Sequence, residues 1–286
     1  MFNDIPPVQI DEDVIKSFKT QNEFSCLGVE LSKELACVAT IIVCSRLKEE
    51  ECFERNDAII YALAIRLNKL YSSMLENYCN NKAEIVKILE RCFFDSYIDL
   101  LCLTKETNNE KFDNFVKHSL NQDYTFYKNI EKNIKERGYE KPIEKRMKKS
   151  IQNYFKLSNL NMDNYSYKGN SWFCKNVYER FEYCGREKLY DAYRMSSHSV
   201  HGGWVDLCMF NLKKVDNGFF INPDFTDVDI RSIAPISLIY IEAITSFIKY
   251  MFPIDLVDEI QIRLEDIENR LILLNETHEK FLQISG

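Results

Sequence analysis

The chain has 286 residues, with only 8 glycines and 6 prolines, and a formal net charge of −7. This length allows a sizeable buried core, and the scarcity of glycine and proline favours long helices over a β-sandwich or barrel. The acidic balance excludes a protein that binds nucleic acid through a uniformly basic surface. We therefore predict an all-α fold, a multi-helix bundle.

Apolar residues recur at helical spacing along most of the chain, which predicts a succession of long helices. Clusters of Asn, Ser and Asp, together with glycine and proline, predict the breaks between them. The predicted helices span residues 13–48, 56–78, 83–104, 111–156 with a break at Gly138 and Pro142, 172–183, 187–200, 230–251 and 254–284. The predicted connections are a loop over 159–171, a short apolar run over 204–212, and a turn-rich segment with room for a hairpin over 216–229.

The charge is distributed unevenly along the chain. Residues 128–156 hold ten Lys or Arg against four Glu. We predict one helical domain over residues 1–286, in which residues 107–157 form a protruding, polar and basic helical insertion. Such a segment is either a solvated helical hairpin or an electrostatic footprint for RNA. The candidate RNA contacts are Lys141, Lys145, Arg146, Lys148 and Lys149.

The cysteines and the apolar runs indicate the compartment. None of the ten cysteines forms a Cys-x-x-Cys pair, and five of them lie in apolar helical stretches, where cysteine acts as a small hydrophobe. The N-terminal residues lack a secretory pattern, so we expect a cytoplasmic protein. The apolar run 233–251 contains Pro235, Glu242 and Lys249, which favours a core helix over a membrane span.

The most informative segment is 193–204, Tyr-Arg-Met-Ser-Ser-His-Ser-Val-His-Gly-Gly-Trp, which holds two of the chain's four histidines. Glycine terminates helices, so the preceding helix is expected to stop at Gly202. Positions four and seven apart share a helix face. Arg194, His198 and His201 are therefore predicted to point the same way.

This grouping has two interpretations. In a metal-independent ribonuclease, His201 or His198 would take the proton of the ribose 2′-hydroxyl or protonate the leaving 5′-oxygen, and Arg194 would hold the phosphate. In a purely structural role, His201 would bond the free carbonyls at the helix end, and Arg194 would pair with a carboxylate. Spacing alone favours the structural role.

The pattern Arg194–Ser197–His201, Arg-x-x-Ser-x-x-x-His, resembles the Arg-x(4–6)-His signature of the HEPN superfamily. With the flanking tyrosine and glycine it resembles, more narrowly, a group of uncharacterised bacterial proteins placed near that superfamily. That group also has an earlier helix with an arginine followed four residues later by an acid, as in Arg91 and Asp95.

This resemblance covers residues 30–105 and 172–250 and leaves the basic segment unaccounted for. It implies a HEPN-like helical bundle, commonly dimeric, in which the Arg and His of both protomers face a shared cleft. Many HEPN proteins are RNA-cutting toxins or phage-defence effectors, and others only bind nucleotides or partners. Met195 departs from the pattern, because active HEPN nucleases usually have a polar residue there. His198, one turn before His201, would compensate.

Arg91 and Asp95 also have two interpretations. Four residues apart on a helix, they can form an intrahelical ion pair. Their apolar surroundings suggest instead that the charges have partners elsewhere, with Asp95 placed against an imidazole or Arg194. We weigh the two evenly. The remaining histidines, His118 and His278, lie on polar helices and are expected at the surface.

Other chemistries find less support. A zinc site would draw on His198, His201, Cys174, Cys184 and Cys208, but the cysteines lack paired spacing and no His-Glu-x-x-His is present. A serine hydrolase would need a Gly-x-Ser-x-Gly turn, which the chain lacks. Neither a metal nor a cofactor is therefore expected.

The sequence thus predicts a HEPN-like protein acting as a metal-independent ribonuclease in a toxin–antitoxin or phage-defence system. The alternative is a catalytically inactive HEPN-like module that binds a nucleotide, RNA or a protein partner. Expected partners are RNA, an antitoxin or other protein, and a second copy in a homodimer, with no membrane. The candidate catalytic residues are Arg194, His201 and His198, supported by Ser197, Arg91 and Asp95.

Overall fold

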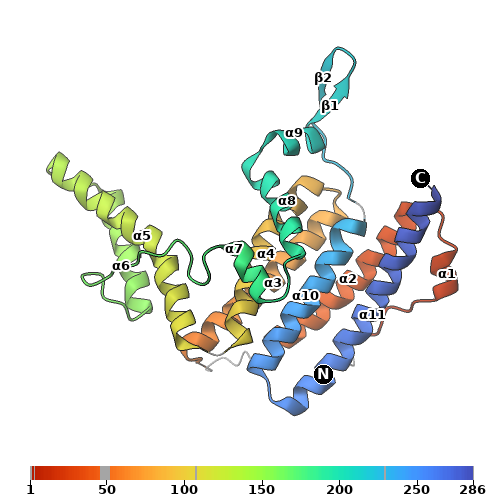
Figure 1. Cartoon of the computed structure of the whole chain (residues 1–286), viewed down its shortest axis with the longest axis horizontal. Helices are drawn as coiled ribbons and strands as arrows, with labels where there is room; N and C mark the ends of the chain where they lie inside the picture. Colours follow the sequence, from red (N-terminus) through yellow and green to blue (C-terminus); the bar gives the residue numbers. More distant parts are fainter. Residues whose placement is uncertain (1, 3, 46–51, 107, 229, 286) are drawn as a thin grey trace. The chain divides into compact units, whose positions relative to one another are not determined.

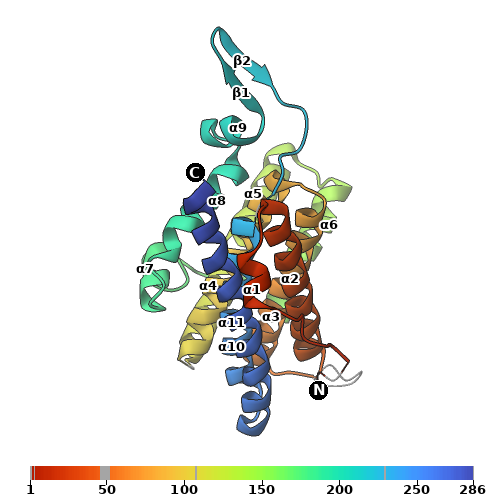
Figure 2. The same ribbon diagram turned by 90° about the vertical axis from the view of Figure 1, so that its right-hand side faces the viewer.

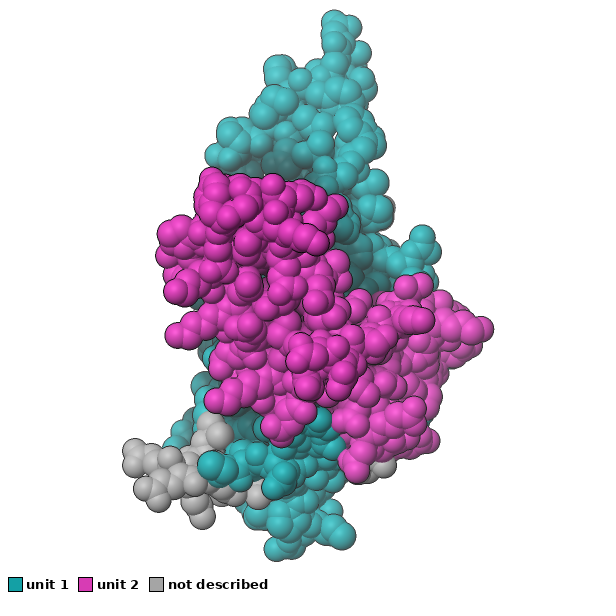
Figure 3. Space-filling view, turned by 90° about the vertical axis from the view of Figure 1, so that its left-hand side faces the viewer, with its two compact units in different colours: residues 1–105, 186–286 teal, residues 106–185 magenta. Residues whose placement is uncertain are grey.

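The computed structural model describes all residues except 1, 3, 46–51, 107, 229 and 286. The described residues form eleven helices and one two-stranded hairpin, which confirms the predicted all-α class (Figure 1). The chain divides into two compact units, coloured separately in Figure 3. Unit 1 comprises residues 1–105 and 186–286, and unit 2 comprises residues 106–185.

Unit 1 is a bundle of long helices that carries shorter helices and the hairpin (Figures 1 and 2). Its elements are α1 (Glu12–Lys16), α2 (Gln21–Cys44), α3 (Arg55–Cys79), α4 (Ala83–Lys105), α8 (Leu189–His201), α9 (Trp204–Phe210), β1 (Leu212–Val215), β2 (Gly218–Ile221), α10 (Ile230–Met251) and α11 (Ile254–Ser285).

The helix predicted over 13–48 is two helices, and its last residues, 46–48, lie outside the described residues. Ser17 ends α1, and Thr20 begins α2 with a capping box, in which the Thr20 side chain and the Glu23 carboxylate each accept from the other's backbone N–H. Capping residues satisfy the free N–H groups of a helix start, so they fix where a new helix begins.

The core of unit 1 is built around α10, which packs against α2, α3, α4 and α11. The rings of Tyr71 and Tyr240 stack with centroids 4.5 Å apart. The Ser237 hydroxyl lies 2.6 Å from the Tyr71 hydroxyl and 3.2 Å from that of Ser32. Burial raises the pKa of Tyr71 to about 12, so this interior network stays uncharged.

Among the described residues, α10 is long and apolar enough to cross a membrane by length and composition. However, 61% of its apolar window is buried inside the protein. This degree of burial is what a core helix in a helical bundle shows, in keeping with the interpretation drawn from the sequence.

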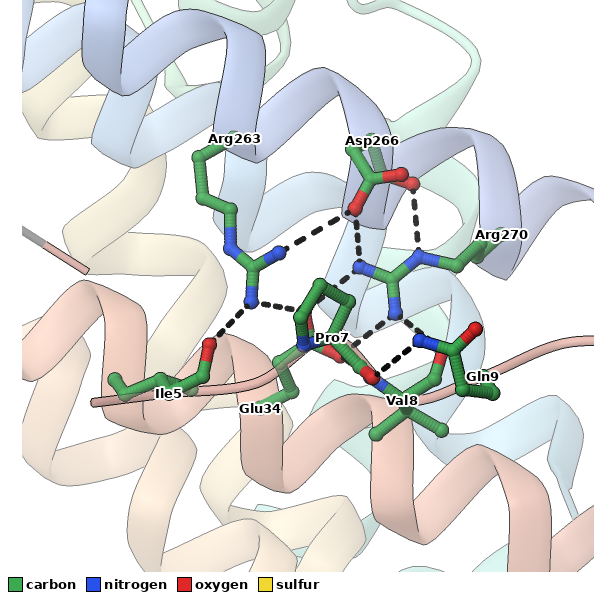
Figure 4. A network of polar contacts seen from close by, with 8 residues as sticks. All are labelled: Ile5, Pro7, Val8, Gln9, Glu34, Arg263, Asp266 and Arg270. Carbon is green, nitrogen blue, oxygen red and sulfur yellow. Dashed lines mark hydrogen bonds and ion pairs between the residues drawn. The ribbon is translucent and has the colours of Figure 1, made fainter. Parts of the chain in front are cut away.

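A polar network joins the segment before α1 to the bundle (Figure 4). The buried carboxylate of Glu34 lies 2.7 Å from both terminal nitrogens of Arg270 and 2.8 Å from Arg263. Asp266 pairs with both arginines. Arg263 donates to the carbonyl of Ile5 and Arg270 to that of Val8, so α2, α11 and the N-terminal segment meet at one closed cluster.

Unit 2 contains α5 (Asn109–Arg137), α6 (Pro142–Leu157) and α7 (Val177–Tyr183). The predicted break between α5 and α6 is confirmed: Gly138 caps α5 with a φ of 84°, and Pro142 is the first residue of α6. A small core lies between the two helices. Its buried members are Leu120, Tyr127, Ile151 and Phe155.

Unit 2 extends to Gly185, beyond the end predicted for the insertion. Leu160, Met162 and Tyr165 pack against the small core, and the Tyr165 hydroxyl bonds the Lys117 carbonyl. The asparagine-rich loop therefore belongs to the inserted unit, because its few apolar side chains are partly buried there. The first predicted residue of the insertion, 107, lies outside the described residues.

The hairpin starts earlier than the sequence predicted. The apolar run after the motif splits into α9 and β1, and the turn at Asp216 and Asn217 leads to Gly218, whose φ of 151° favours glycine. Strand β1 pairs antiparallel with β2, with Leu212 opposite Ile221. The hairpin projects beyond the ends of the unit 1 helices (Figures 1 and 2).

One expectation about burial was wrong. His278 is fully buried, where its Nε2 lies 2.5 Å from Gln21 Oε1 and its ring is 4.9 Å from that of Phe24, because α2 covers this end of α11. The cysteines are all free, and of those in apolar helices only Cys102 is buried. The exposed or partly exposed ones are Cys37, Cys44, Cys92 and Cys208.

Candidate functional site

Helix α8, which carries the histidine motif, packs on α4 through one face. Tyr193 and Ser196 are buried, whereas Arg194, His198 and His201 are exposed. The helix ends where the sequence predicted, because Gly202 adopts the left-handed conformation with a φ of 58°. The motif is therefore divided between an inward face and an outward face.

The inward face is held by Arg91 from α4. Its Nε donates to the Ser197 hydroxyl at 3.0 Å, and one terminal nitrogen donates to the Tyr193 hydroxyl. The guanidinium carbon lies 3.8 Å from the centroid of the Tyr193 ring, which adds a cation–π contact. Another terminal nitrogen pairs with Asp95. Arg91 thus ties the middle of α8 to α4.

A second anchor holds the residues before α8. Arg186 forms an ion pair of 2.5 Å with Glu242 of α10, and the Tyr97 hydroxyl donates to the same carboxylate at 2.6 Å. The hydrogen bond to Glu242 raises the pKa of Arg186. Burial and the adjacent carboxylate raise the pKa of Tyr97, so its phenol stays protonated and keeps donating. The start of the motif helix is therefore fixed as well.

The outward face of α8 presents three side chains without internal partners. Within the described part of the chain, no hydrogen bond or ion pair involves the side chains of Arg194, His198 or His201. Residues three and four apart on a helix have β-carbons about 5–6 Å apart, so the guanidinium and the two imidazoles lie within reach of one small ligand.

The two contacts that the structural interpretation of the motif required are not made among the described residues. That interpretation required an imidazole bonded to the last helical carbonyls and an arginine paired with a carboxylate. Among the described residues, Gly202 alone ends the helix, and neither His198 nor His201 bonds a carbonyl. Arg194 likewise has no carboxylate partner there. All three groups are available to a ligand from solvent.

Both interpretations of Arg91 and Asp95 are partly met. The intrahelical ion pair is present, and Asp95 is about half exposed, at 47%. The contact with the motif helix is nevertheless made by Arg91 and not, as the functional interpretation had it, by Asp95. The sequence analysis assigned no role to Tyr193. Tyr193 lies four residues before Ser197, which places both on one helix face, and this spacing could have indicated that the two share a partner.

The predicted RNA contacts of the basic segment all lie in unit 2, at the start and along α6. Lys141, Lys145, Arg146 and Lys149 are exposed. Lys148 is partly buried, because it pairs with Glu140 at 3.4 Å. The four exposed cations suit contacts with phosphate, as do the cations of any solvated helix.

The described residues include no group of three or more His, Cys, Asp or Glu placed to hold a metal ion. His198 and His201 are adjacent on α8, but no third ligand of these types joins them within the described residues. The chemistry available at the motif is therefore that of one guanidinium, two imidazoles and the nearby hydroxyl of Ser197, which accepts from Arg91.

Comparison with known proteins identifies one family whose matched region includes both Arg91 and the histidine motif. Residues 57–219 match the model of a family of unknown function, DUF5677. The matched region begins in α3, includes Arg91 and the whole histidine motif, and ends in β2. No curated protein and no solved structure matches the chain. Because the match spans more than half of the residues, the chain belongs to the DUF5677 family.

Proposed function

We propose that this protein is a HEPN-like, metal-independent endoribonuclease, of the kind that acts in toxin–antitoxin or phage-defence systems in the cytoplasm. The observation that carries the proposal is the outward face of α8. Arg194, His198 and His201 point to solvent without internal partners, while the opposite face of the helix is fixed by Arg91. A guanidinium that no carboxylate of the described residues neutralises suits a polyanionic ligand.

In the proposed reaction, one imidazole takes the proton of a ribose 2′-hydroxyl, and the 2′-oxygen attacks the adjacent phosphorus. The bond from phosphorus to the 5′-oxygen breaks, and the other imidazole, as its imidazolium, protonates that leaving oxygen. Arg194 neutralises the charge on the pentavalent phosphorane. We assign acid–base chemistry to His201 and His198. The products are a 2′,3′-cyclic phosphate and a free 5′-hydroxyl.

Ser197, Arg91 and Asp95 are positioning residues in this proposal. Arg91 reaches α8 only through Ser197 and Tyr193, and it contacts none of the three exposed groups among the described residues. Its contribution is to hold the orientation of α8. A catalytic group displaced by about 1 Å can lose a factor of about 10² in rate, so this support matters.

The test is cleavage of single-stranded RNA by the purified chain in the presence of EDTA. We expect cleavage with cyclic-phosphate ends, and a loss of about a hundredfold or more in rate for Arg194→Ala and His201→Ala. A matched control is Lys188→Ala, which removes an exposed cation from the N-cap of the same helix. It should cleave like the unmodified chain. A substrate with 2′-deoxyribose at the cut position should be inert.

Expression in bacteria provides an independent readout. The unmodified chain should slow growth, and either Arg194→Ala or His201→Ala should relieve this effect. Cleavage that requires a divalent metal, or full activity in His201→Ala, would overturn the proposal. If RNA or a nucleotide binds through Arg194 without being cut, the protein is instead the catalytically inactive binding module.

A further inference from the structure

The hairpin β1–β2 and the adjacent helix α9 expose an unusual amount of apolar surface. Six large apolar side chains of this region are between 45% and 72% exposed. Several large apolar side chains exposed close together in the chain are typical of a surface that binds a partner. The six are Trp204, Val205 and Met209 of α9 and Phe219, Phe220 and Ile221 of β2.

The apolar side chains of β2 occupy both faces of the hairpin. In the β1–β2 register, Phe219 lies opposite Lys214, and Phe220 lies opposite Lys213. Successive residues of a strand point to opposite faces, so Phe219 and Ile221 share one face and Phe220 lies on the other. Trp204 contacts the Phe219 ring edge-on, with centroids 5.6 Å apart, which covers only part of the first face.

The two edges of the hairpin differ in charge. Strand β1 carries Lys213 and Lys214, both exposed. Lysine on an edge strand discourages pairing with another chain. Strand β2, Gly218–Ile221, carries no charge, and in the described part of the chain its outer edge pairs with no other strand. An open, apolar edge of this kind is a template for strand addition.

We propose that β2 is a dimerisation strand that pairs antiparallel with β2 of a second copy of this chain. A two-fold axis through Phe220 would place it opposite the partner's Phe220, and Phe219 opposite the partner's Ile221. The result is a four-stranded sheet with the order β1–β2–β2–β1. Sheets of three or more strands with an apolar face are stable, whereas an isolated two-stranded hairpin is marginal in water.

The charge distribution selects a second copy as the occupant. In this sheet the two β1 strands lie at the outer edges, about 14 Å apart for a strand spacing of 4.8 Å. The Lys214 ammonium of each copy lies over the Phe219 ring of its own hairpin, 4.8 Å from the ring centroid, so it has a favourable contact there. The central pair brings together only apolar side chains, including an aromatic pair across the axis. An acidic partner strand would instead favour the β1 edge. This inference does not rest on the proposed nuclease activity.

The experiment is the oligomeric state of the full-length chain, measured by sedimentation equilibrium over a range of concentrations. We expect a dimer. Phe220→Lys places two like charges opposite each other, so it should raise the dissociation constant by about a hundredfold or more. Lys213→Glu, on the outer edge of the proposed sheet, is the matched control and should leave the dimer intact. Far-UV circular dichroism should be the same for all three.

A cross-link tests the register without weakening the interface. Facing residues of an antiparallel pair have β-carbons about 4.5–5.5 Å apart, close to the spacing that a disulfide spans. Phe220→Cys should therefore form a disulfide-linked dimer when copper phenanthroline removes two electrons and two protons from the facing thiols. Lys213→Cys, and the unmodified chain with its ten cysteines, should not form it at a comparable rate.

Three results would overturn the inference. The first is a chain that stays monomeric at every concentration. The second is a dimer that Phe220→Lys leaves unchanged, which would place the interface on another surface. The third is an open-ended assembly, which a two-fold pairing of β2 does not produce.

Discussion

Unit 1 contains two clusters with arginine side chains that are built in opposite ways. In the first, shown in Figure 4, Arg263 and Arg270 share the buried carboxylate of Glu34 and the partly exposed one of Asp266. In the second, on the outward face of α8, Arg194 stands beside two imidazoles, and the described residues supply it with no carboxylate.

The two clusters differ in the role of their charged side chains. Removing charges from water is expensive, and a buried pair is tolerated only when hydrogen bonds satisfy both ions. The Glu34 cluster meets this condition at the Glu34 carboxylate and at Arg270, while the buried Nε of Arg263 has no hydrogen-bond partner among the described residues. The cluster joins three segments of the chain, so its role is structural. The side chains of the α8 cluster are exposed to water, so folding does not desolvate them. They contribute little to stability and can bind an anion.

The largest effect is expected from breaking the closed cluster. Glu34→Ala leaves two largely buried guanidinium groups with only the half-exposed carboxylate of Asp266 between them, and we expect the free energy of unfolding to fall by about 3–5 kcal/mol. Urea denaturation measures this loss. The control is Glu30→Ala on the same helix, because Glu30 pairs only with Lys33 and both are half exposed. It should change stability by about 0.5 kcal/mol or less.

A loss below about 1 kcal/mol for Glu34→Ala would contradict this comparison. It would mean that the arginines find water or other carboxylates once Glu34 is gone. The segment before α1 should also loosen in the variant, since the backbone N–H of Val8 donates to the Glu34 carboxylate at 2.8 Å. Faster proteolysis within residues 5–10 would report that change.

A loss of stability of intermediate size is expected when Arg91 is replaced. Arg91→Met removes the bonds to Tyr193 and Ser197, the cation–π contact and the ion pair, and should lower stability by about 1–3 kcal/mol. Hydrogen exchange should accelerate in α8 more than in α3. Asp95→Asn, which removes only the half-exposed partner, should cost less than about 1 kcal/mol. Equal exchange in both helices would show that Arg91 does not anchor α8.

These clusters also show what could be predicted from the sequence. Local signals were read correctly: Gly138 and Pro142 divide α5 from α6, and Gly202 ends the motif helix. Each depends on backbone conformations that a few neighbouring residues determine. The shared face of Arg194 and His201 followed from helical spacing alone.

Contacts between distant segments could not be predicted in this way. Glu34 and Arg270 are 236 residues apart, and Arg91 and Tyr193 are 102 apart. Nothing in either local sequence specifies the partner. His278 illustrates the same limit, because its helix is polar by composition yet its ring is buried under α2. The exact start of the hairpin was missed for a different reason, since a short apolar run fits a helix and a strand equally well.

A smaller, pH-dependent effect is expected at Glu90, a buried carboxyl that pairs with Lys87 at 2.9 Å. Burial raises the pKa of Glu90, and the Lys87 ammonium offsets this only in part. A carboxyl whose pKa is higher in the folded state stabilises the fold fully below its ordinary pKa. That stability is lost as the pH rises through the raised value.

Glu90→Gln should therefore gain stability relative to the unmodified chain as the pH rises from the ordinary glutamate value, about 4.3, toward neutrality. Thermal unfolding at several pH values measures the difference. Glu76→Gln, which changes an exposed glutamate of α3, should show no such trend. A difference that shrinks with rising pH would mean that Lys87 outweighs the effect of burial.

The smallest effect on stability is expected at the outward face of α8. This expectation is the most direct test of the difference between the two clusters. Arg194→Ala, His198→Ala and His201→Ala remove exposed groups that have no internal partner among the described residues, so each should stay within about 0.5 kcal/mol of the unmodified chain. A loss as large as that of Glu34→Ala would show that Arg194 is a structural cation after all. Unchanged stability together with lost RNA cleavage would separate the two clusters completely, because the same type of side chain would then hold the fold at one place and act on a ligand at the other.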